Sequence, residues 1–262
     1  MKAIYFVILI FLGGCFLKPV YTPPWPGFPN PSQVQIPELI SALDQRNSSW
    51  KSAHAKVHIQ LSSDEGDHPK LSAELFMKKP DQIRLRAYNP LGLIAFDLLY
   101  HDQKIELYLP HRKEVVVVPI DQKDELNFGD TPLVLPNPQD WWRILQPWQG
   151  LENRSLKEIK LQKNNNPASG VLELENDQFT FNWKTGRITH ILLDGHVSFQ
   201  YEKWRSKKNM EYASWVEMKR NSLIITMDIL KITWDPTFPD AIFKPVNKSL
   251  ITTTNLGQSE TP

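Results

Sequence analysis

The sequence predicts a mainly β fold of the α+β type: one antiparallel sheet whose apolar face is covered by two short helices. Three observations lead to this fold class. Apolar and polar residues alternate with a period of two over many short stretches, as in strands with one buried and one solvated face. Short connections separate these stretches, and 41% of the residues are hydrophobic, which is enough for a substantial core. Only two segments have helical spacing instead.

The first residues of the chain, MKAIYFVILIFLGGC, have the order of an export signal: a basic residue, a short apolar run and then small residues. The apolar run from Ala3 to Leu12 is too short to cross a bilayer comfortably, which takes about 20 residues. Cys15 is the only cysteine, so it cannot form an internal disulfide. An ordinary secretory signal followed by an unmodified cysteine is the alternative interpretation.

The tetrapeptide LGGC, which ends at Cys15, resembles the lipobox of bacterial lipoproteins. The resemblance implies a signal peptide over residues 1–14, cleavage before Cys15, two acyl chains such as palmitate on its sulfur, and a third on the new amino group. One acyl chain gives only reversible membrane binding, since each buried CH₂ contributes about 0.8 kcal/mol, whereas three chains anchor persistently. We therefore expect a mature protein that is anchored to a membrane and does not span it.

Residues 15–36 are predicted to form a tether between the lipid and the folded domain. The stretch KPVYTPPWPGFPNPSQVQIP has too many prolines for a helix or a central strand. Such segments favour extended polyproline II, which rises about 3.1 Å per residue and acts as a semi-rigid spacer. The alternative is a docking segment for a partner, to which Tyr21, Trp25 and Phe28 would contribute aromatic side chains.

The folded domain is expected over residues 37–245 and begins with a short amphipathic helix. Pro37 suits the first helical position, and several apolar side chains after it fall near one stripe. These are Leu39, Ile40, Leu43 and Trp50. The period then changes to two, and the strands expected next cover residues 53–61, 71–79, 83–87, 96–98, 105–109 and 114–120.

The alternation breaks between Asp121 and Gly150, where a tryptophan-rich helix is expected. This helix starts after a proline and an aspartate, and its apolar face is formed by Trp141, Trp142, Leu145 and Trp148. Strands are then expected at residues 170–176, 178–184, 187–195, 196–204, 214–220 and 222–235. Residues 246–262 are polar and are expected to form a disordered tail.

The sequence contains no motif that indicates an enzyme. G-x-S-x-G, G-x-G-x-x-G, the P-loop and H-E-x-x-H are absent, and acylation of Cys15 leaves no thiol for catalysis. His54 and His58 would lie on one face of a strand, about 13 Å apart at 3.3 Å per residue, which is too far to share a metal ion. The net charge of +1 does not indicate nucleic-acid binding. We therefore expect no enzyme, no metal and no cofactor.

The apolar face of a single sheet must be covered, and only the two short helices are available to cover it. Either the helices and the sheet form an ordinary solid core, or they enclose a cavity for an apolar ligand. The composition does not distinguish between these two arrangements.

Three stretches resemble the LolB-like outer-membrane lipoproteins of the LolA/LolB superfamily. IRLRAYNPLGLIAFDL resembles the family's two strands around an Asn-Pro-Leu-Gly turn, and LVLPNPQDWWRILQPWQG resembles its proline, short helix with a tryptophan and closing glycine. SWVEMKRNSLIITMDILKITW resembles its final strand pair. The resemblance implies a curved, incomplete antiparallel β-barrel with a helical lid over a hydrophobic cavity, which would hold the acyl chains of a lipoprotein in transit.

Strand parity then predicts which side chains line this cavity and bind acyl chains. They are the inward-facing residues of several expected strands and one tryptophan of the lid. The predicted lining consists of Ile83, Leu85, Ala87, Phe96, Leu98, Ile105, Leu107, Leu109, Phe179, Phe181, Trp183 and, from the lid, Trp141.

The resemblance also implies that Leu91, in the Asn-Pro-Leu-Gly turn, protrudes and inserts into the membrane to deliver cargo. Pro90 would stiffen the tip and Gly92 would permit the turn. Full burial of a leucine is favourable by roughly 1.5–3 kcal/mol, so its contact with the membrane would be reversible. The lipid anchor would keep the protein at the membrane. The alternative is that Leu91 folds back under its own sheet as a small satellite contact.

Together these features predict a function in lipoprotein localisation. The protein would be a monomer, anchored at the outer membrane and facing the periplasm. It would take lipoproteins from a soluble LolA-like carrier and pass their acyl chains to the inner leaflet of the outer membrane. The residue after the cysteine is Phe16 and not aspartate, which favours the outer membrane by the enterobacterial sorting rule. The second hypothesis is a structural or assembly lipoprotein of the envelope that uses the same fold to bind a protein partner.

Overall fold

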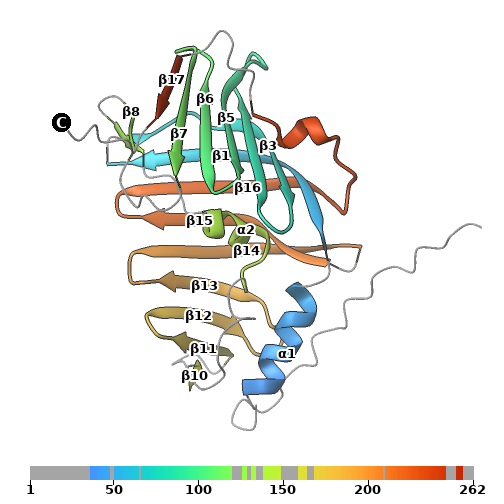
Figure 1. The fold of residues 1–262 in the computed structure, drawn as a ribbon. Coiled ribbons are helices and arrows are strands. Elements are labelled where there is room, and N and C mark those ends of the chain that lie inside the picture. Colours follow the sequence, from blue (N-terminus) through green and yellow to red (C-terminus); the bar gives the residue numbers. More distant parts are fainter. Residues whose placement is uncertain are drawn as a thin grey trace, which may run out of the picture.

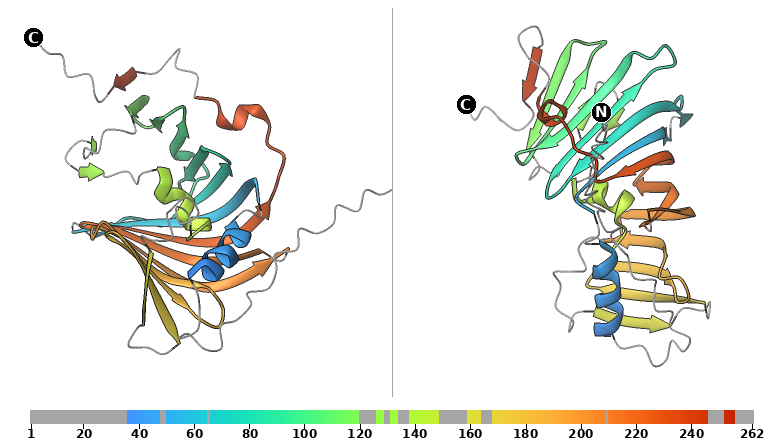
Figure 2. Two further views of the ribbon diagram at one scale, coloured as in Figure 1. Left: turned by 60° about the horizontal axis from the view of Figure 1, so that its bottom comes forward. Right: turned by 90° about the vertical axis from the view of Figure 1, so that its right-hand side faces the viewer.

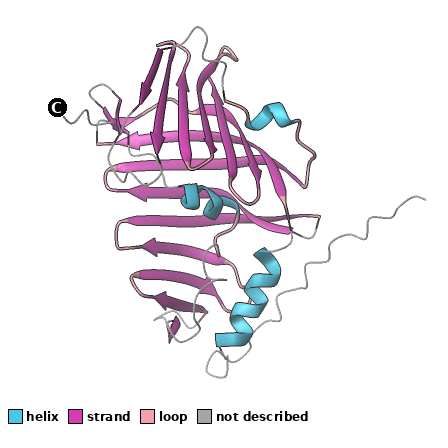
Figure 3. Ribbon diagram, in the orientation of Figure 1, coloured by secondary structure: helices cyan, strands magenta, loops and turns pink. Residues whose placement is uncertain are grey.

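The computed structural model describes the larger part of the chain, and strands predominate in it (Figures 1 and 3). The described residues are 36–47, 50–64, 66–119, 126–128, 131–133, 138–148, 159–163, 168–208, 210–245 and 252–255. The expected signal peptide, Cys15 and the expected tether up to residue 35 lie outside them.

Helices and strands follow one another along the chain in three groups. The first group contains α1 (Ile36–Asn47), β1 (Ser52–Ser63), β2 (Gly66–Asp67), β3 (Leu71–Lys78), β4 (Gln82–Tyr88), β5 (Ile94–His101), β6 (Lys104–Leu109) and β7 (Glu114–Pro119). The middle group contains β8 (Leu126–Phe128), β9 (Thr131–Leu133) and α2 (Pro138–Leu145). The last group contains β10 (Ile159–Lys163), β11 (Ser169–Leu174), β12 (Asp177–Asn182), β13 (Ile188–Leu193), β14 (Val197–Lys207), β15 (Met210–Arg220), β16 (Leu223–Trp234), the 3₁₀ helix η2 (Asp240–Phe243) and β17 (Thr252–Asn255).

One sheet contains all of these strands except β8 and β9, which pair with each other. Its order is β10-β11-β12-β13-β14-β15-β16-β1-β3-β4-β5-β6-β7-β17, and β2 pairs with β1 beside this path. Its described pairings are antiparallel, apart from the parallel pairing of β17 with β7. Within the described residues the sheet is open, because β10 and β17 end it without pairing with each other. The predicted incomplete antiparallel barrel is therefore confirmed.

Strand β1 joins the two halves of the sheet. It pairs with β16 on one side and with β3 on the other, so the two meanders, β3–β7 and β10–β16, meet along it. The pairing with β16 shifts between Lys56 and Val57, which leaves Leu230 without a partner residue in β1. Strands on the two sides of β1 run in clearly different directions (Figure 1), so the sheet is strongly twisted.

Both α-helices lie on the same side of the sheet (Figures 1 and 2). Helix α2 lies over β14 and β15, and α1 lies beside the strands near the β10 end. This covered side carries the main hydrophobic core, because alternate residues of each strand point toward it. In the part of the chain that the structure describes, no helix combines the length and the apolar character needed to cross a membrane.

The expected elements agree with the structure except at a few places. Helix α1 begins at Ile36, and α2 ends at Leu145, so that Trp148 follows the helix and is not part of it. Strand β10 and the β8–β9 hairpin are additional elements that the sequence reasoning missed. Strand β17 lies inside the segment expected to be disordered; its four residues pair with the otherwise free edge of β7, so the expectation does not hold for them.

Candidate functional site

The covered side of the sheet carries one continuous hydrophobic core. Strands from both meanders contribute to the same cluster of contacting side chains. All twelve residues of the predicted lining belong to it: Phe96 and Leu109 pack at its margin, and the others are buried. The structure thus brings these residues together on one face, while their binding of a ligand remains a prediction.

Helix α2 closes over this core. Pro138 suits the start of a helix because its missing N–H needs no partner there. In the first turn, the Asp140 Oδ1 atom lies 3.0 Å from Arg143 Nη1, an ion pair one helical turn apart. The apolar face of the helix is buried against the sheet and consists of Trp141, Trp142, Ile144 and Leu145.

Trp148, just beyond α2, covers the part of the core near β12. Its ring centroid lies 6.4 Å from that of Phe179 and 5.8 Å from that of Phe181. The Phe181 ring in turn meets Trp183 edge-on at 4.7 Å. A Cβ atom at Gly170 would lie 2.5 Å from a Trp183 ring atom, so only glycine fits beside this aromatic group. Sequence reasoning missed Gly170, which carries no signal beyond its place in a strand.

Trp50 connects the helices to the last long strand. Its ring centroid lies 5.7 Å from that of Trp142 in α2 and 5.4 Å from that of Trp234 in β16. Leu39 and Ile40 of α1 are buried in the same core. Trp50 therefore contacts the lid helix and the sheet at once, and a displacement of α2 would have to break its contact with Trp50.

A few polar groups lie beneath the helices. The Tyr201 hydroxyl, which is buried, donates a hydrogen bond of 3.1 Å to the backbone carbonyl of Arg143 at the end of α2. Burial raises the pKa of Tyr201 well above its ordinary value of 10.0, so the hydroxyl stays protonated. Two buried donors, Arg143 Nε and Trp234 Nε1, have no hydrogen-bond partner among the residues that the structure describes. They could bind an acceptor such as an ester carbonyl.

The Asn-Pro-Leu-Gly turn between β4 and β5 presents its leucines to solvent. The Asn89 Oδ1 atom accepts hydrogen bonds of 3.0 Å from the backbone N–H groups of both Leu91 and Leu93. Gly92 has a φ of 77°, a left-handed conformation that suits glycine. Leu91 is 83% exposed and Leu93 is 62% exposed. Leu91 therefore points away from the sheet and does not fold back against it.

Few large hydrophobic side chains are exposed in the described part of the chain. Among the described residues, the large hydrophobic side chains that are exposed are Leu91, Leu93 and Leu230, and two of them share one turn. Pro90 and Gly92 are exposed beside them, as the sequence predicts for a protruding tip. Leu93 was missed, although an apolar residue directly after a turn glycine and before a strand was visible in the sequence.

The opposite face of β4 and β5 carries a buried ion pair. Arg84 donates from Nε and Nη2 to the two carboxylate oxygens of Asp97, at 2.7 and 2.6 Å, and Arg86 Nε donates to the same carboxylate at 3.0 Å. Arg84 is only 4% exposed and Asp97 only 3%. Arg84 Nη1 also donates to the carbonyl oxygen of Ile242, 2.6 Å away. The charged alternation predicts a solvated face here; that prediction is wrong, because the segment containing η2 covers this face.

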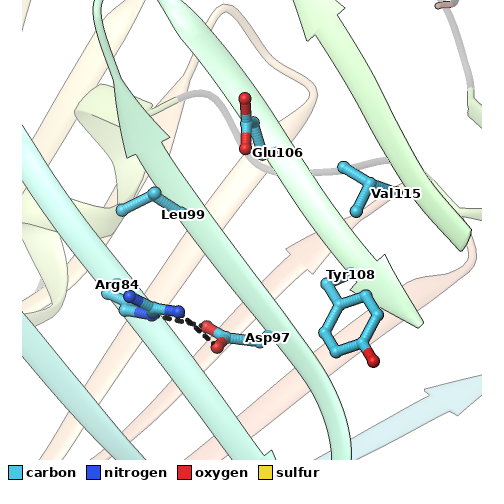
Figure 4. A pocket seen from close by; sticks show the side chains of 6 residues that line it. All are labelled: Arg84, Asp97, Leu99, Glu106, Tyr108 and Val115. Carbon is cyan, nitrogen blue, oxygen red and sulfur yellow. Dashed lines mark hydrogen bonds and ion pairs between the residues drawn. The ribbon is translucent and has the colours of Figure 1, made fainter. Parts of the chain in front are cut away.

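This covering segment has a small apolar cluster of its own, made of Phe76, Leu99, Phe238, Ile242 and Phe243. Next to it lies a cavity of about 10 Å³, which has room for about one water molecule (Figure 4). Its lining consists of Arg84, Asp97, Leu99, Glu106, Tyr108 and Val115. The cavity is far too small for an acyl chain, so the covered side remains the candidate binding site.

His54, one of the two histidines considered for metal binding, has ordinary contacts. The His54 ring stacks on Phe76 with 4.5 Å between centroids, and its Nε2 atom lies 3.2 Å from Glu74 Oε1. The described residues contain no group of three or more histidine, cysteine or acidic side chains that could hold a metal ion.

Comparison with known proteins gives a likeness in structure only. No protein-family model matches the chain, and no curated protein sequence matches it. An outer membrane lipoprotein-sorting protein domain from Vibrio parahaemolyticus is 11% identical with a TM-score of 0.53, over 82% of this chain and 97% of that one. A LolA superfamily protein from Nitrosomonas europaea is 11% identical with a TM-score of 0.51, over 81% of this chain and 98% of that one.

A DUF1329 family protein from Desulfovibrio piger is 12% identical with a TM-score of 0.57, over 81% of this chain and 96% of that one. The chain shares the fold of these three proteins. This likeness agrees with the fold expected from the sequence motifs. The closer resemblance to LolB rests on those motifs alone.

Proposed function

We propose that this protein is a lipid-anchored outer-membrane lipoprotein that binds acyl chains of other lipoproteins beneath its helices and delivers them to the membrane. The observation that carries the proposal is the apolar interior, which is closed by two short helices and not by a second sheet. The shared fold with a lipoprotein-sorting domain and with a LolA superfamily protein supports it.

The energies of lid and ligand are comparable, so one can replace the other. Helix α2 and Trp148 bury five large apolar side chains, each stabilised by roughly 1.5–3 kcal/mol. An acyl chain that buries about ten CH₂ groups gains about 8 kcal/mol at 0.8 kcal/mol each. A ligand with two or three chains can therefore offset the displacement of α2 and occupy the face that the helix leaves.

The interior also offers donors for the polar end of such a ligand. Arg143 Nε and Trp234 Nε1 are buried and have no partner in the described part of the chain, which costs stability unless a ligand supplies a hydrogen-bond acceptor. The ester and amide carbonyls that join acyl chains to a lipoprotein cysteine are acceptors of this kind. No covalent step is needed, since differences in affinity between successive apolar sites set the direction of transfer.

Delivery would use the exposed turn. Leu91 and Leu93 project into solvent, and each gains roughly 1.5–3 kcal/mol on burial in a bilayer. This is enough for reversible contact, while acylated Cys15 would keep the protein at the outer membrane, facing a LolA-like carrier in the periplasm.

Two residues of the neighbouring strands β5 and β6 provide a matched test of acyl-chain binding. Phe96 packs at the core margin, whereas Tyr108 pairs with Asp97 and lines the small cavity on the opposite face of the sheet. Phe96→Lys should weaken binding of a fluorescent fatty-acid probe at least ten-fold, and Tyr108→Lys should leave it unchanged, with both proteins folded by circular dichroism. Equal binding by the two variants would contradict an acyl-chain site on this face.

Native mass spectrometry of the purified protein distinguishes the proposal from a structural role in the envelope. Co-purified acyl lipid or lipoprotein is the expected result. A stoichiometric envelope protein without lipid would favour the structural or assembly function. In cells, depletion of the protein should prevent lipoproteins from reaching the outer membrane. Normal sorting of lipoproteins after depletion would exclude the acceptor role.

A further inference from the structure

A basic turn lies beside the exposed leucines. The β6–β7 turn contains His111, Arg112 and Lys113, and all three side chains are exposed. The turn is held by its backbone, with hydrogen bonds of 3.1 Å from Arg112 N to Leu109 O and from Lys113 N to Pro110 O. Its side chains therefore do not take part in holding the local structure and are free to bind something else.

Strand register places this turn next to the leucine turn. Asp97 of β5 pairs with Tyr108 of β6 at this end of the sheet, and both turns follow within a few residues of this pair. Both turns lie at the upper end of the strands β5 to β7 in Figure 1. The leucine turn and the basic turn are therefore neighbouring tips at one end of the sheet.

Among the residues that the structure describes, no side chain neutralises the basic charge of this turn. None of the three side chains forms an ion pair or a side-chain hydrogen bond in the described part of the chain. The buried acid nearby, Asp97, is already paired with two arginines. Exposed apolar side chains beside cations without an internal partner suit the surface of a bilayer, where anionic phosphates lie next to the acyl region.

We propose that Leu91, Leu93, Arg112 and Lys113 form one docking surface for a membrane that contains anionic phospholipids. The leucines enter the acyl region while Arg112 and Lys113 bind lipid phosphates at the headgroup level. This inference rests on the proposed function and adds to it the class of lipid at which cargo is delivered.

The test measures vesicle binding by the full chain carrying Cys15→Ser, so that the contribution of the N-terminal segment is the same in every variant. Vesicles contain either phosphatidylcholine alone or equal amounts of phosphatidylcholine and phosphatidylglycerol. Each Lys or Arg near an anionic surface strengthens binding about five-fold. Arg112→Gln with Lys113→Gln should therefore weaken binding to the mixed vesicles about 25-fold, leave binding to phosphatidylcholine unchanged, and reduce the salt dependence.

A second pair of exposed basic residues serves as the control. Lys203 and Arg205 lie on β14, in the other half of the sheet from both turns. Their double change to Gln removes the same charge and should leave vesicle binding unchanged. If Arg112→Gln with Lys113→Gln binds the mixed vesicles like the unchanged protein, the inference is overturned and an acidic protein becomes the partner of the basic turn. If the unchanged protein binds neither kind of vesicle, membrane contact itself fails, and with it the delivery step of the proposed function.

Discussion

The two faces of β4 and β5 are covered in different ways. On one face, Leu85 and Leu98 belong to a core that helices close through apolar contacts. On the other face, Arg84 and Asp97 are buried beneath the segment containing η2, which is fixed by directional hydrogen bonds to backbone carbonyls. Apolar contacts are non-directional and can be replaced by a lipid, whereas a buried ion pair tolerates no such exchange. One sheet can thus combine an exchangeable cover with a permanent one.

Breaking the permanent cover should have the largest effect on stability. Asp97→Ala leaves Arg84 buried and without its counter-ion, which should lower the free energy of unfolding by about 3–5 kcal/mol in urea titrations. The double change Arg84→Met with Asp97→Leu removes both charges and should recover most of this loss. Equal losses in the single and double variants would show that burial of an unpaired charge is not the cause.

Removing one aromatic ring from each cover compares the two faces directly. Phe243→Ala on the outer face and Trp148→Ala on the lid side should each cost about 3 kcal/mol of stability. Only Trp148→Ala should speed the exchange of a bound fatty-acid probe, because only that ring covers the proposed site. Faster exchange in Phe243→Ala as well would indicate that the outer cover also moves.

A smaller effect is expected from the hydrogen bond between Tyr201 and the end of α2. Tyr201→Phe should cost about 1 kcal/mol. Burial raises the folded-state pKa of Tyr201 above 10.0. As the pH rises past 10.0, the Tyr201 hydroxyl ionises in the unfolded chain but not in the folded one, so the unchanged protein loses stability in this range. Unfolding titrations in that range should therefore be less steep in pH for Tyr201→Phe than for the unchanged protein.

The smallest effect on stability is expected at the exposed turn. Leu91→Glu should change the free energy of unfolding by less than about 0.5 kcal/mol and leave acyl-chain binding intact, yet block delivery to vesicles. Leu230→Glu is the matched control, since Leu230 is also exposed but lies on β16, away from the turn. A Leu91→Glu protein that unfolds would place this side chain in the core.

Period-two alternation predicted the covered face well and the other face poorly. Ile83, Leu85 and Phe96 could be assigned to one side because every strand that packs on a common core repeats the same parity. The same pattern made Arg84 and Asp97 look solvated. What buries them is a segment distant in sequence, and alternation within a strand carries no information about such a cover. Strand β17 escaped detection for a related reason, since its pairing depends on the free edge of β7.

The position of β1 in the sheet has a consequence for folding kinetics. Ala53 pairs with Trp234, so β1 gains its second partner strand, β16, only when nearly the whole domain has been made, whereas its other partner, β3, follows closely in sequence. Contacts between residues so far apart in the chain are formed slowly, because a long loop must close first. Until then one edge of β1 is unpaired and open to association with other chains. A chain truncated before β16 should therefore aggregate, even though the meander from β3 to β7 would be complete.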